Sequence, residues 1–517
     1  MSRAKALMFL GTGSDVGKSI LSSAFCRIFK QEGYRVAPFK AQNMALNSFI
    51  TPEGGEMGRA QVVQAEAAGI PPHVDMNPIL LKPTSRMGSQ VIVLGKAIGN
   101  YSAKEYYEYK KELVSVVRAA FERLSAENDV IVMEGAGSAV ELNLKEHDLV
   151  NMAMADMADA KCILVGDIDR GGIFAALLGS YWLLEPAERE RMIGFIVNKL
   201  RGDPRLFSDG TGIITSRSGL PVFGVVPYFD NIALPEEDSV ALGRRMGKPS
   251  EAAATDGSLK IGVVRLPFIS NYTDFDCFEH DPGVSLVYFD RPAEVFGFDA
   301  VILPGSKNTI EDLEALALTG MADALSSYFK SGGVVVGLCG GYQMMGTVVR
   351  DPHGMESSLD EIKGIGLLQM ETEMYPEKVT SQVEASATVQ SGTFAGCSGL
   401  LTGYEIHMGR SIPHGNPVPL FKISKRDGKA TDALDGLTSP DGRAWGTYIH
   451  GIFDNDEFRQ CFLGYLEQRN GKHRSAANEF SYRMWKDEQY DLLADLVREH
   501  VDVNRILDIV LRGRSAK

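Results

Sequence analysis

The chain has 517 residues, of which 44% are hydrophobic and 23% charged, and its formal net charge is −14. This length predicts two large domains or three smaller ones with ordinary globular cores. The acidic balance argues against a nucleic-acid surface, and no apolar run reaches the ~18 residues of a membrane span. The short apolar N-terminal stretch runs into a glycine loop and lacks a signal-peptide cleavage site, so we expect a cytoplasmic protein.

The first part of the chain alternates short apolar runs with amphipathic stretches. We expect helices at residues 19–31 and 103–126, and strands at residues 6–10, 35–39, 91–94, 130–133, 162–165, 195–197 and 222–226. Strands that alternate with helices predict a mostly parallel sheet covered on both faces, which is the doubly wound α/β class. We assign residues 1–242 to this domain.

A polar stretch rich in small residues, 243–258, is the predicted linker. A second α/β run follows over residues 259–470, with strands expected from Leu259 and at residues 285–289, 300–303, 333–337 and 365–370. The last segment, 471–517, is predicted to be a charged helical tail. The sequence therefore predicts two doubly wound α/β domains and a helical tail.

The first motif is a glycine loop between an apolar strand and a helix, which is the context of a nucleotide-binding P-loop. Lys18 is expected to neutralise the β- and γ-phosphates, and the Ser19 hydroxyl to bind Mg²⁺. Five residues separate Gly11 from Gly17, so the spacing is longer than usual, and a purely structural glycine turn is the alternative. We assign phosphate binding to the whole loop: Gly11, Thr12, Gly13, Ser14, Asp15, Val16, Gly17, Lys18 and Ser19.

Polar residues follow three later strands of the predicted sheet. Glu134, Asp167 and Asp169 lie where strand ends line the ligand crevice, and Glu134 is the preferred second ligand for Mg²⁺. Helix caps or turns are the alternative role for each carboxylate. Asn198 is a candidate contact for adenine, although an Asn after a strand is often only turn chemistry. Such a loop serves kinases, synthetases and partition-type ATPases alike.

The second motif is Gly337-Leu-Cys339-Gly340-Gly341, which follows an apolar strand. Flanking glycines permit the sharp turn that lifts a nucleophile above a sheet, and the following helix favours a thiolate. The other five cysteines have no metal or disulfide spacing and are expected to be inert: Cys26, Cys162, Cys277, Cys397 and Cys461.

A nucleophilic thiol needs a base, and His450 is the best candidate among the nine histidines. His407 is the second, as a residue that positions the site or the substrate, or as a structural histidine. The turn at Gly305 and the backbone of Gly340 are candidate oxyanion donors toward a glutamine amide. A carboxylate that orients the imidazole would complete a triad.

The elbow, a later Tyr404-Glu-Ile-His407-Met-Gly and a final His450-Gly-Ile-Phe resemble a class I glutamine amidotransferase domain of the cobalamin-pathway type. The long-spaced glycine loop resembles that of dethiobiotin synthetase. Joined in this order, the two domains resemble the cobyrinic and cobyric acid amide synthases. The N-terminal domain is then expected to be P-loop NTPase-like and the C-terminal domain flavodoxin-like.

Further blocks resemble the cobyric acid synthase branch of this family: residues 40–48, 56–61, 77–83, 134–138 and 167–172. These blocks contain possible substrate contacts at Asn43, Arg59, Gln61 and Lys82, although solvated helix faces are the plainer interpretation of each. The resemblance implies that ATP and Mg²⁺ activate the b, d, e and g carboxylates of adenosylcobyrinic acid a,c-diamide. It also implies that glutamine supplies the nitrogen through Cys339 and His450.

The sequence departs from most class I domains at one point, because Ile452 stands where a His-x-Glu motif has the glutamate that orients the histidine. Two alternatives stay open at this stage. A sister synthetase would amidate another acid, such as cobyrinic acid or a cell-wall precursor. A partition-type ATPase switch would carry an inactive amidotransferase-like module.

Overall fold

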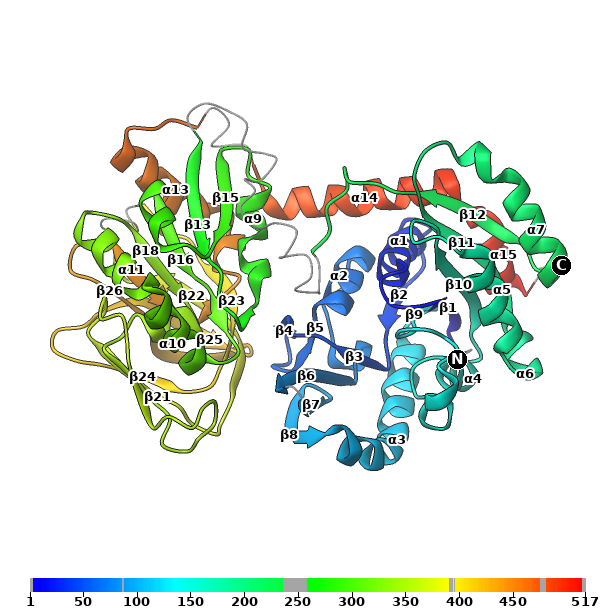
Figure 1. Ribbon diagram of the computed structural model, residues 1–517, viewed down its shortest axis with the longest axis horizontal. Helices are drawn as coiled ribbons and strands as arrows, with labels where there is room; N and C mark the ends of the chain where they lie inside the picture. Colours follow the sequence, from blue (N-terminus) through cyan, green and yellow to red (C-terminus); the bar gives the residue numbers. More distant parts are fainter. Residues whose placement is uncertain are drawn as a thin grey trace. The chain divides into compact units, whose positions relative to one another are not determined.

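The computed structural model describes residues 3–85, 88–235, 258–389, 394, 396–474 and 480–513, which form two compact units (Figure 1). Unit 1 comprises Met1–Ala45, Glu56–Pro235 and Lys486–Lys517, and unit 2 comprises Leu46–Gly55 and Glu236–Trp485. Residues 243–257 of the predicted linker lie outside the described residues. No helix in the described ranges is long and apolar enough to cross a membrane.

Unit 1 is built on a six-stranded sheet that confirms the predicted α/β class. Every neighbouring pair is parallel, and the strand order is β12-β11-β10-β1-β9-β2. The strands are β1 (Lys5–Gly11), β2 (Val36–Phe39), β9 (Val130–Glu134), β10 (Lys161–Asp167), β11 (Met192–Leu200) and β12 (Val222–Pro227). Their apolar runs are buried because helices cover both faces.

The helices of unit 1 include both predicted ones. They are α1 (Lys18–Gln31), α2 (Arg59–Ala68), α3 (Ala103–Glu127), α4 (Met152–Ala158), α5 (Ile173–Leu183), α6 (Pro186–Arg189) and α7 (Ser208–Ser218). Helix α1 packs on the sheet face that carries Leu7 and Phe9. Helix α5 packs close to Gly166, where an added Cβ would lie 2.6 Å from Ile173.

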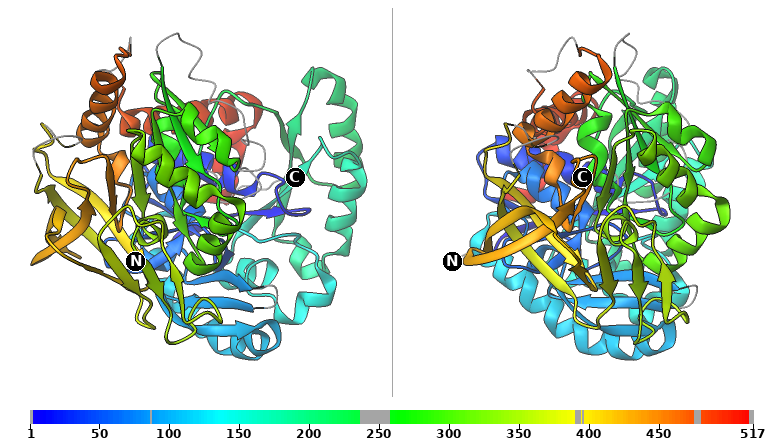
Figure 2. Two further views of the ribbon diagram at one scale, coloured as in Figure 1. Left: turned by 60° about the vertical axis from the view of Figure 1, so that its left-hand side comes forward. Right: turned by 90° about the vertical axis from the view of Figure 1, so that its left-hand side faces the viewer.

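The predicted strand at residues 91–94 does not join the parallel sheet. It lies in β7 (Gly88–Val93), which pairs antiparallel with β6 (Ile79–Ser85) and β8 (Lys96–Ser102). Strand β3 (Gln42–Met44) completes this four-stranded sheet by pairing parallel with β6. The sheet lies beside α3 (Figure 2). A two-residue turn at Leu94-Gly95 connects β7 to β8, and this hairpin explains why no crossover helix follows the run.

The predicted helical tail forms α14 (Tyr482–His500) and α15 (Val503–Arg512) and belongs largely to unit 1. Apolar side chains of both helices join the core that contains Phe9 and Phe25. Arg27 of α1 is 5% exposed and bonds to Asp487 at 2.8 Å and Asp491 at 2.7 Å. The last segment of the chain thus covers the helix that follows the glycine loop.

Unit 2 is built on a ten-stranded sheet with two halves. The parallel half contains β15 (Val284–Phe289), β13 (Leu259–Val264), β16 (Ala300–Leu303), β18 (Val335–Leu338) and β27 (Ala444–Thr447). The antiparallel half, not expected from the sequence, contains β26 (Lys429–Thr438), β25 (Val418–Arg426), β22 (Val379–Ala387), β23 (Leu401–His407) and β28 (Ile449–His450).

Shorter elements complete unit 2. The helices are η5 (Tyr272–Phe275), α9 (Asp276–Glu279), α10 (Thr309–Thr319), α11 (Met321–Lys330), α12 (Gly340–Met344) and α13 (Asp456–Asn470). The small sheets contain β14 (Ile269–Ser270) with β17 (Gly305–Ser306), and β19 (Val348–Arg350), β20 (Glu361–Lys363), β21 (Met370–Glu373) and β24 (Arg410–Pro413). The short strand β4 (Ser48–Ile50) also belongs to unit 2, whereas the short strand β5 (Glu56–Gly58) belongs to unit 1.

The predicted strand at residues 365–370 is wrong except for its last residue. The backbone N–H groups of Ile365 and Leu367 donate to the carbonyls of Met344 and Met345, each at 2.9 Å. This stretch therefore satisfies the free carbonyls at the end of α12 instead of pairing with a strand. Its apolar side chains pack on the core, which is why the run looks like a buried strand in the sequence.

Candidate functional site

The glycine loop of unit 1 connects β1 to α1, as predicted. Asp15 and Gly17 have φ values of 58° and 104°, in the left-handed region that favours glycine. The Asn198 side chain donates to the Val16 carbonyl at 2.9 Å, and a Cβ on Gly17 would lie 1.9 Å from its amide nitrogen. Asn198 therefore holds the loop in shape.

Lys18 lies inside the loop and is 6% exposed. Its Nζ donates to the Gly13 carbonyl at 2.8 Å and the Gly137 carbonyl at 3.0 Å. Burial lowers the pKa of Lys18 to about 8, although the nearby Glu134 carboxylate opposes the shift. An anionic ligand beside Lys18 would restore the charged form.

Glu134 ends β9 and faces the loop with almost complete burial. Its Oε1 accepts from Ser19 Oγ at 2.8 Å and Lys40 Nζ at 2.8 Å, and its Oε2 accepts from Gln64 Nε2 at 2.6 Å. Burial raises the pKa of Glu134, but Lys40, Lys18 and the Ser19 hydroxyl outweigh burial and hold it below its usual range. The carboxylate is therefore ionised beside the Ser19 hydroxyl.

This oxygen pair fits Mg²⁺ better than a softer metal. No group of three or more His, Cys, Asp or Glu side chains in the described residues could hold a metal ion. Mg²⁺ is usually held by one or two protein oxygens and completes its octahedron with water and phosphate oxygens. Ser19 and Glu134 supply protein oxygens of this kind.

The other two predicted carboxylates are engaged in ion pairs. Asp167 lies 3.0 Å from Lys199 Nζ, and Asp169 lies 2.8 Å from Arg201 Nε. Asp167 also accepts from the Asp169 backbone N–H at 2.9 Å. These contacts engage both carboxylates and shape the loop after β10.

The predicted substrate contacts of unit 1 are buried and largely paired. Asn43 donates to Gln61 Oε1 at 3.1 Å, and Lys82 bonds to Glu56 at 2.5 Å with both side chains 1% exposed. Arg59 is also buried, at the start of α2. The Gln61 Nε2 has no partner among the described residues, one helical turn from the Gln64 that contacts Glu134. The Gln61 side chain thus offers an N–H donor on the same helix as the Gln64 that bonds to Glu134.

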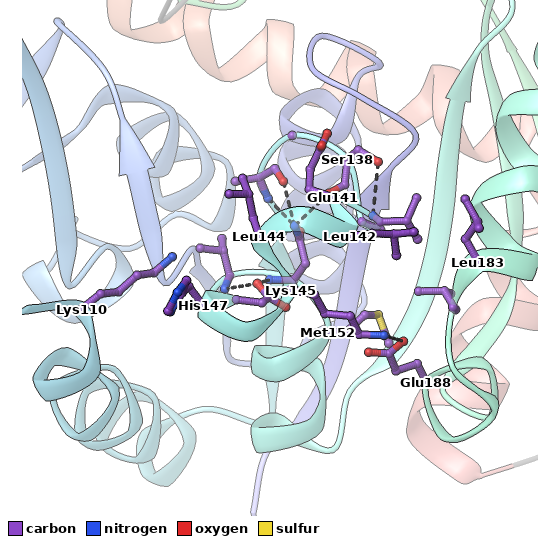
Figure 3. A pocket seen from close by; sticks show the side chains of 18 of the residues that line it. Lys110, Ser138, Glu141, Leu142, Leu144, Lys145, His147, Met152, Leu183 and Glu188 are labelled. Carbon is purple, nitrogen blue, oxygen red and sulfur yellow. Dashed lines mark hydrogen bonds and ion pairs between the residues drawn. The ribbon is translucent and has the colours of Figure 1, made fainter. Parts of the chain in front are cut away.

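A pocket of about 270 Å³ lies along the loop that follows Glu134 (Figure 3). The Ala139 backbone N–H donates to the Gly11 carbonyl at 2.9 Å, so this loop and the glycine loop support each other. Apolar side chains of Leu142 and Leu183 lie on one side, and Lys110 and His147 lie on another. The loop that lines the pocket is therefore bonded to the glycine loop, although none of residues 11–19 lines the pocket itself.

In unit 2 the predicted nucleophile elbow is present. Cys339 has φ 50° and ψ −109° between β18 and α12, and it is 8% exposed. A Cβ on Gly341 would lie 2.0 Å from the Leu303 carbonyl, and one on Gly337 would lie 2.7 Å from the Tyr342 backbone. The glycines are therefore required by close packing around a strained cysteine.

His450 lies beside Cys339 and is held by a carboxylate that the sequence analysis did not identify. Its Nδ1 lies 2.6 Å from Asp274 Oδ2, and Asp274 Oδ1 accepts from the Gly451 N–H at 2.9 Å. Burial lowers the pKa of His450, but the Asp274 carboxylate and Cys339 outweigh burial and raise it to about 10. Asp274 therefore occupies the role left open by Ile452.

The two predicted oxyanion positions meet at this centre. A Cβ on Gly340 would lie 2.8 Å from the Ser306 backbone nitrogen. A Cβ on Gly305 would lie 3.4 Å from Cε1 of His450. The elbow and the β17 turn therefore approach each other closely, and the β17 turn lies beside the imidazole.

His407 lies near the Cys339–His450 pair, because the Cys339 thiol donates to the carbonyl of the preceding residue, Ile406, at 3.5 Å. Its ring stacks on Tyr448 with centroids 3.8 Å apart, and its Nδ1 lies 3.1 Å from the Gly409 carbonyl. Burial lowers the pKa of His407 to about 3, so the ring is neutral. The Tyr448 hydroxyl also accepts from Gln343, which connects His407 to the helix after the elbow.

Together the two sites define a class of protein. A nucleotide-binding loop with an ionised carboxylate, and an amidotransferase elbow with a histidine–aspartate pair, are the parts of a ligase that takes nitrogen from glutamine. Two family descriptions match, the CobQ/CobB/MinD/ParA nucleotide binding domain at residues 7–241 and the CobB/CobQ-like glutamine amidotransferase domain at residues 260–458.

Similarity over the full length identifies the family. The chain is 70% identical to the cobyric acid synthase of Syntrophobacter fumaroxidans over 511 residues, which cover 99% of each chain. It is 48% identical to the cobyric acid synthase of Desulfitobacterium hafniense over 506 residues, which cover 97% of each chain. The chain belongs to the cobyric acid synthase family, and it is a glutamine-dependent amide-forming ligase of cobalamin biosynthesis.

Proposed function

We propose that this protein uses ATP and Mg²⁺ to convert the b, d, e and g carboxylates of adenosylcobyrinic acid a,c-diamide into amides, giving cobyric acid. Residues 1–242 serve as the synthetase domain and residues 259–470 as the glutaminase domain. The observation that carries the ATP assignment is the contact of Ser19 with Glu134 at 2.8 Å beside Lys18. Mg²⁺ bound at Ser19 and Glu134 would neutralise charge on the phosphates.

In the glutaminase centre, Cys339 attacks the side-chain amide carbon of glutamine. The backbone N–H groups at Gly305 and Gly340 stabilise the oxyanion that forms. His450 donates a proton to the leaving ammonia, and the glutamyl thioester that remains is hydrolysed by water activated by the same imidazole. Asp274 holds the imidazole in the orientation that both steps need.

In the synthetase domain, a carboxylate oxygen of the corrinoid attacks the γ-phosphorus of ATP and displaces ADP. Lys18 stabilises the charge on the transferred phosphoryl group. Ammonia then attacks the acyl phosphate and displaces phosphate, which leaves the amide. Asn43, Arg59, Gln61 and Lys82 are proposed to hold the corrinoid carboxylates, and the free Nε2 of Gln61 supports this role.

A labelling experiment tests the proposed reaction. The protein is incubated with ATP, Mg²⁺, amide-¹⁵N glutamine and adenosylcobyrinic acid a,c-diamide, and the corrinoid is analysed by mass spectrometry. We expect one ¹⁵N for each of the b, d, e and g positions. ATP hydrolysis without label in the corrinoid would overturn the substrate, and cobyrinic acid would then be tested as the sister acid.

A further inference from the structure

The segment Leu46–Gly55 belongs to unit 2, although the chain on both sides of it belongs to unit 1. In the sequence it follows β3 and precedes β5. Ten residues from the N-terminal part of the chain are therefore built into the amidotransferase unit.

This segment contacts the residues around the glutaminase centre. Asn47, which is 1% exposed, accepts the Asn271 backbone N–H on its Oδ1 at 2.9 Å. The Ser48 carbonyl accepts the Tyr404 hydroxyl at 3.4 Å. The Phe49 ring lies 4.9 Å from the Tyr404 ring, and the Ile50 carbonyl accepts from Gln382. The segment is thus bound at several points within unit 2.

The contact at Asn271 leads directly to the triad. Asn271 has a left-handed φ of 51° and precedes the turn η5, which carries Asp274. The Asn271 carbonyl accepts the Asp274 N–H at 3.0 Å, which fixes the turn. Asp274 in turn holds the His450 Nδ1 at 2.6 Å. Asn47 therefore satisfies the buried N–H of the residue that sets the direction of Asp274.

A second path leads through Tyr404. Its ring lies parallel to the His450 ring, with centroids 5.2 Å apart and planes at 18°. Its hydroxyl accepts from Asn271 Nδ2 at 3.3 Å, in addition to its bond to Ser48. The imidazole is therefore held at its edge by Asp274 and on its face by Tyr404, and the segment contacts the supports of both.

We propose that Leu46–Gly55 is a positioning element of the glutaminase centre and that Asn47 is its principal positioning residue. Asn47 holds the Asn271 turn so that Asp274 faces His450, and Ser48 holds Tyr404 over the same ring. The inference rests on the proposed roles of Cys339 and His450 in glutamine hydrolysis. It adds to that centre a part of the chain that precedes the amidotransferase domain in the sequence.

The test compares Asn47→Ala with Asn47→Asp in the full chain. The Ala variant removes the acceptor for the Asn271 N–H, whereas Asp keeps an Oδ1 acceptor of the same length. We expect Asn47→Ala to lower kcat for glutamine hydrolysis about 10- to 100-fold, as a small misplacement of a catalytic group does. Amidation with free ammonia stays unchanged, and Asn47→Asp restores most of the glutamine-dependent rate.

The pH profile separates positioning from a general loss of structure. With Asp274 displaced, His450 loses the charge that keeps it protonated, so the alkaline limb of the Asn47→Ala glutaminase profile moves to lower pH. Tyr404→Phe keeps the ring but removes the hydroxyl, and it gives a smaller loss of rate. Glu53→Gln, at an exposed position of the same segment, is the matched control and leaves the rate unchanged.

Wild-type glutamine hydrolysis in Asn47→Ala would overturn the inference. An equal loss of glutamine-dependent and ammonia-dependent activity would also overturn it, because it would show a structural role for the whole protein. Glutamine use that survives in Cys339→Ala would instead contradict the proposed function, so the two failures are distinguishable.

Discussion

The Nδ1 atom of His450 and the Oδ2 atom of Asp274 lie 2.6 Å apart, and both side chains are almost completely buried. The histidine ends the short strand β28, and the aspartate lies in the turn η5. A charged pair in such a place costs desolvation, so its retention beside a strained cysteine points to a role in catalysis.

Replacement of Asp274 by Asn should lower the rate of glutamine hydrolysis by about 10²- to 10⁴-fold, because the imidazole loses its orientation and its charged partner. In the native protein His450 is protonated until the pH rises through about 10. Without the carboxylate, burial lowers the pKa of the imidazole, so the alkaline limb of kcat/KM for glutamine moves to lower pH. Asp276→Asn in the next turn is the control, and an unchanged limb in Asp274→Asn would contradict the assignment.

Replacement of Cys339 by Ala should abolish glutamine-dependent amidation, since no thiolate remains to form the thioester. Amidation with ammonium chloride at alkaline pH should continue, because free ammonia needs no glutaminase. Formation of amidated corrinoid with each nitrogen source is the measurement. Cys461→Ala, at a half-buried position outside the elbow, should keep both activities.

Replacement of Lys18 by Met should reduce amidation roughly 10²- to 10³-fold with either nitrogen source, because the transferred phosphoryl group loses its cation. Hydrolysis of glutamine alone should stay at the native rate. In the native protein the KM for ATP should increase as the pH rises through about 8, where buried Lys18 loses its proton. A KM for ATP that is flat between pH 7 and pH 9 would show that phosphate binding is independent of this charge.

The buried carboxyl of Asp435 should make unit 2 less stable at alkaline pH. Burial raises its pKa to about 7, despite bonds from Thr447 and the Tyr448 N–H. Between about pH 4 and pH 7 the folded state keeps a proton that the unfolded state has lost, so the free energy of unfolding falls as the pH rises. The full penalty is present above pH 7.

Asp435→Asn should therefore raise Tm by a few degrees at pH 8 and by less at pH 5. Differential scanning calorimetry at the two pH values measures the difference. Asp432→Asn on the same strand, which is exposed, is the control. A lower Tm for Asp435→Asn at pH 8 would show that the ionised carboxylate stabilises the fold.

The parts of the molecule that follow from the sequence are those encoded locally. The glycine loop and the cysteine elbow are short motifs whose glycines have a direct steric reason, so Lys18, Ser19 and Cys339 could be identified. Asp274 could not be, because its distance to His450 depends on how β13, η5 and β28 come together. The strand predicted at residues 365–370 failed for a related reason, since its hydrogen bonds go to the end of a helix.

The division of the chain into two units also depends on contacts between segments that are distant in the sequence. Continuity along the sequence places Asn47 with the nucleotide-binding part, and only the folded contacts with Asn271 assign it to unit 2. Conversely, the α14 and α15 helices follow the amidotransferase part in the sequence and yet complete the core around Phe25. In both cases a segment packs in the unit that is distant from it in the sequence, and a hydrophobic pattern does not show which unit a segment will join.

The segment Leu46–Gly55 and the residues that it contacts are synthesised at different times. The ribosome makes it long before η5 and β28, so the glutaminase centre stays incomplete until nearly the whole chain has emerged. A nascent chain therefore contains Asn47 before it contains Asn271 and Asp274. A chain truncated at its N-terminus contains Asn271 and Asp274 but lacks Asn47. The α14 and α15 helices, which complete the core of unit 1, emerge later still, so both units depend on segments made at the opposite end of the chain.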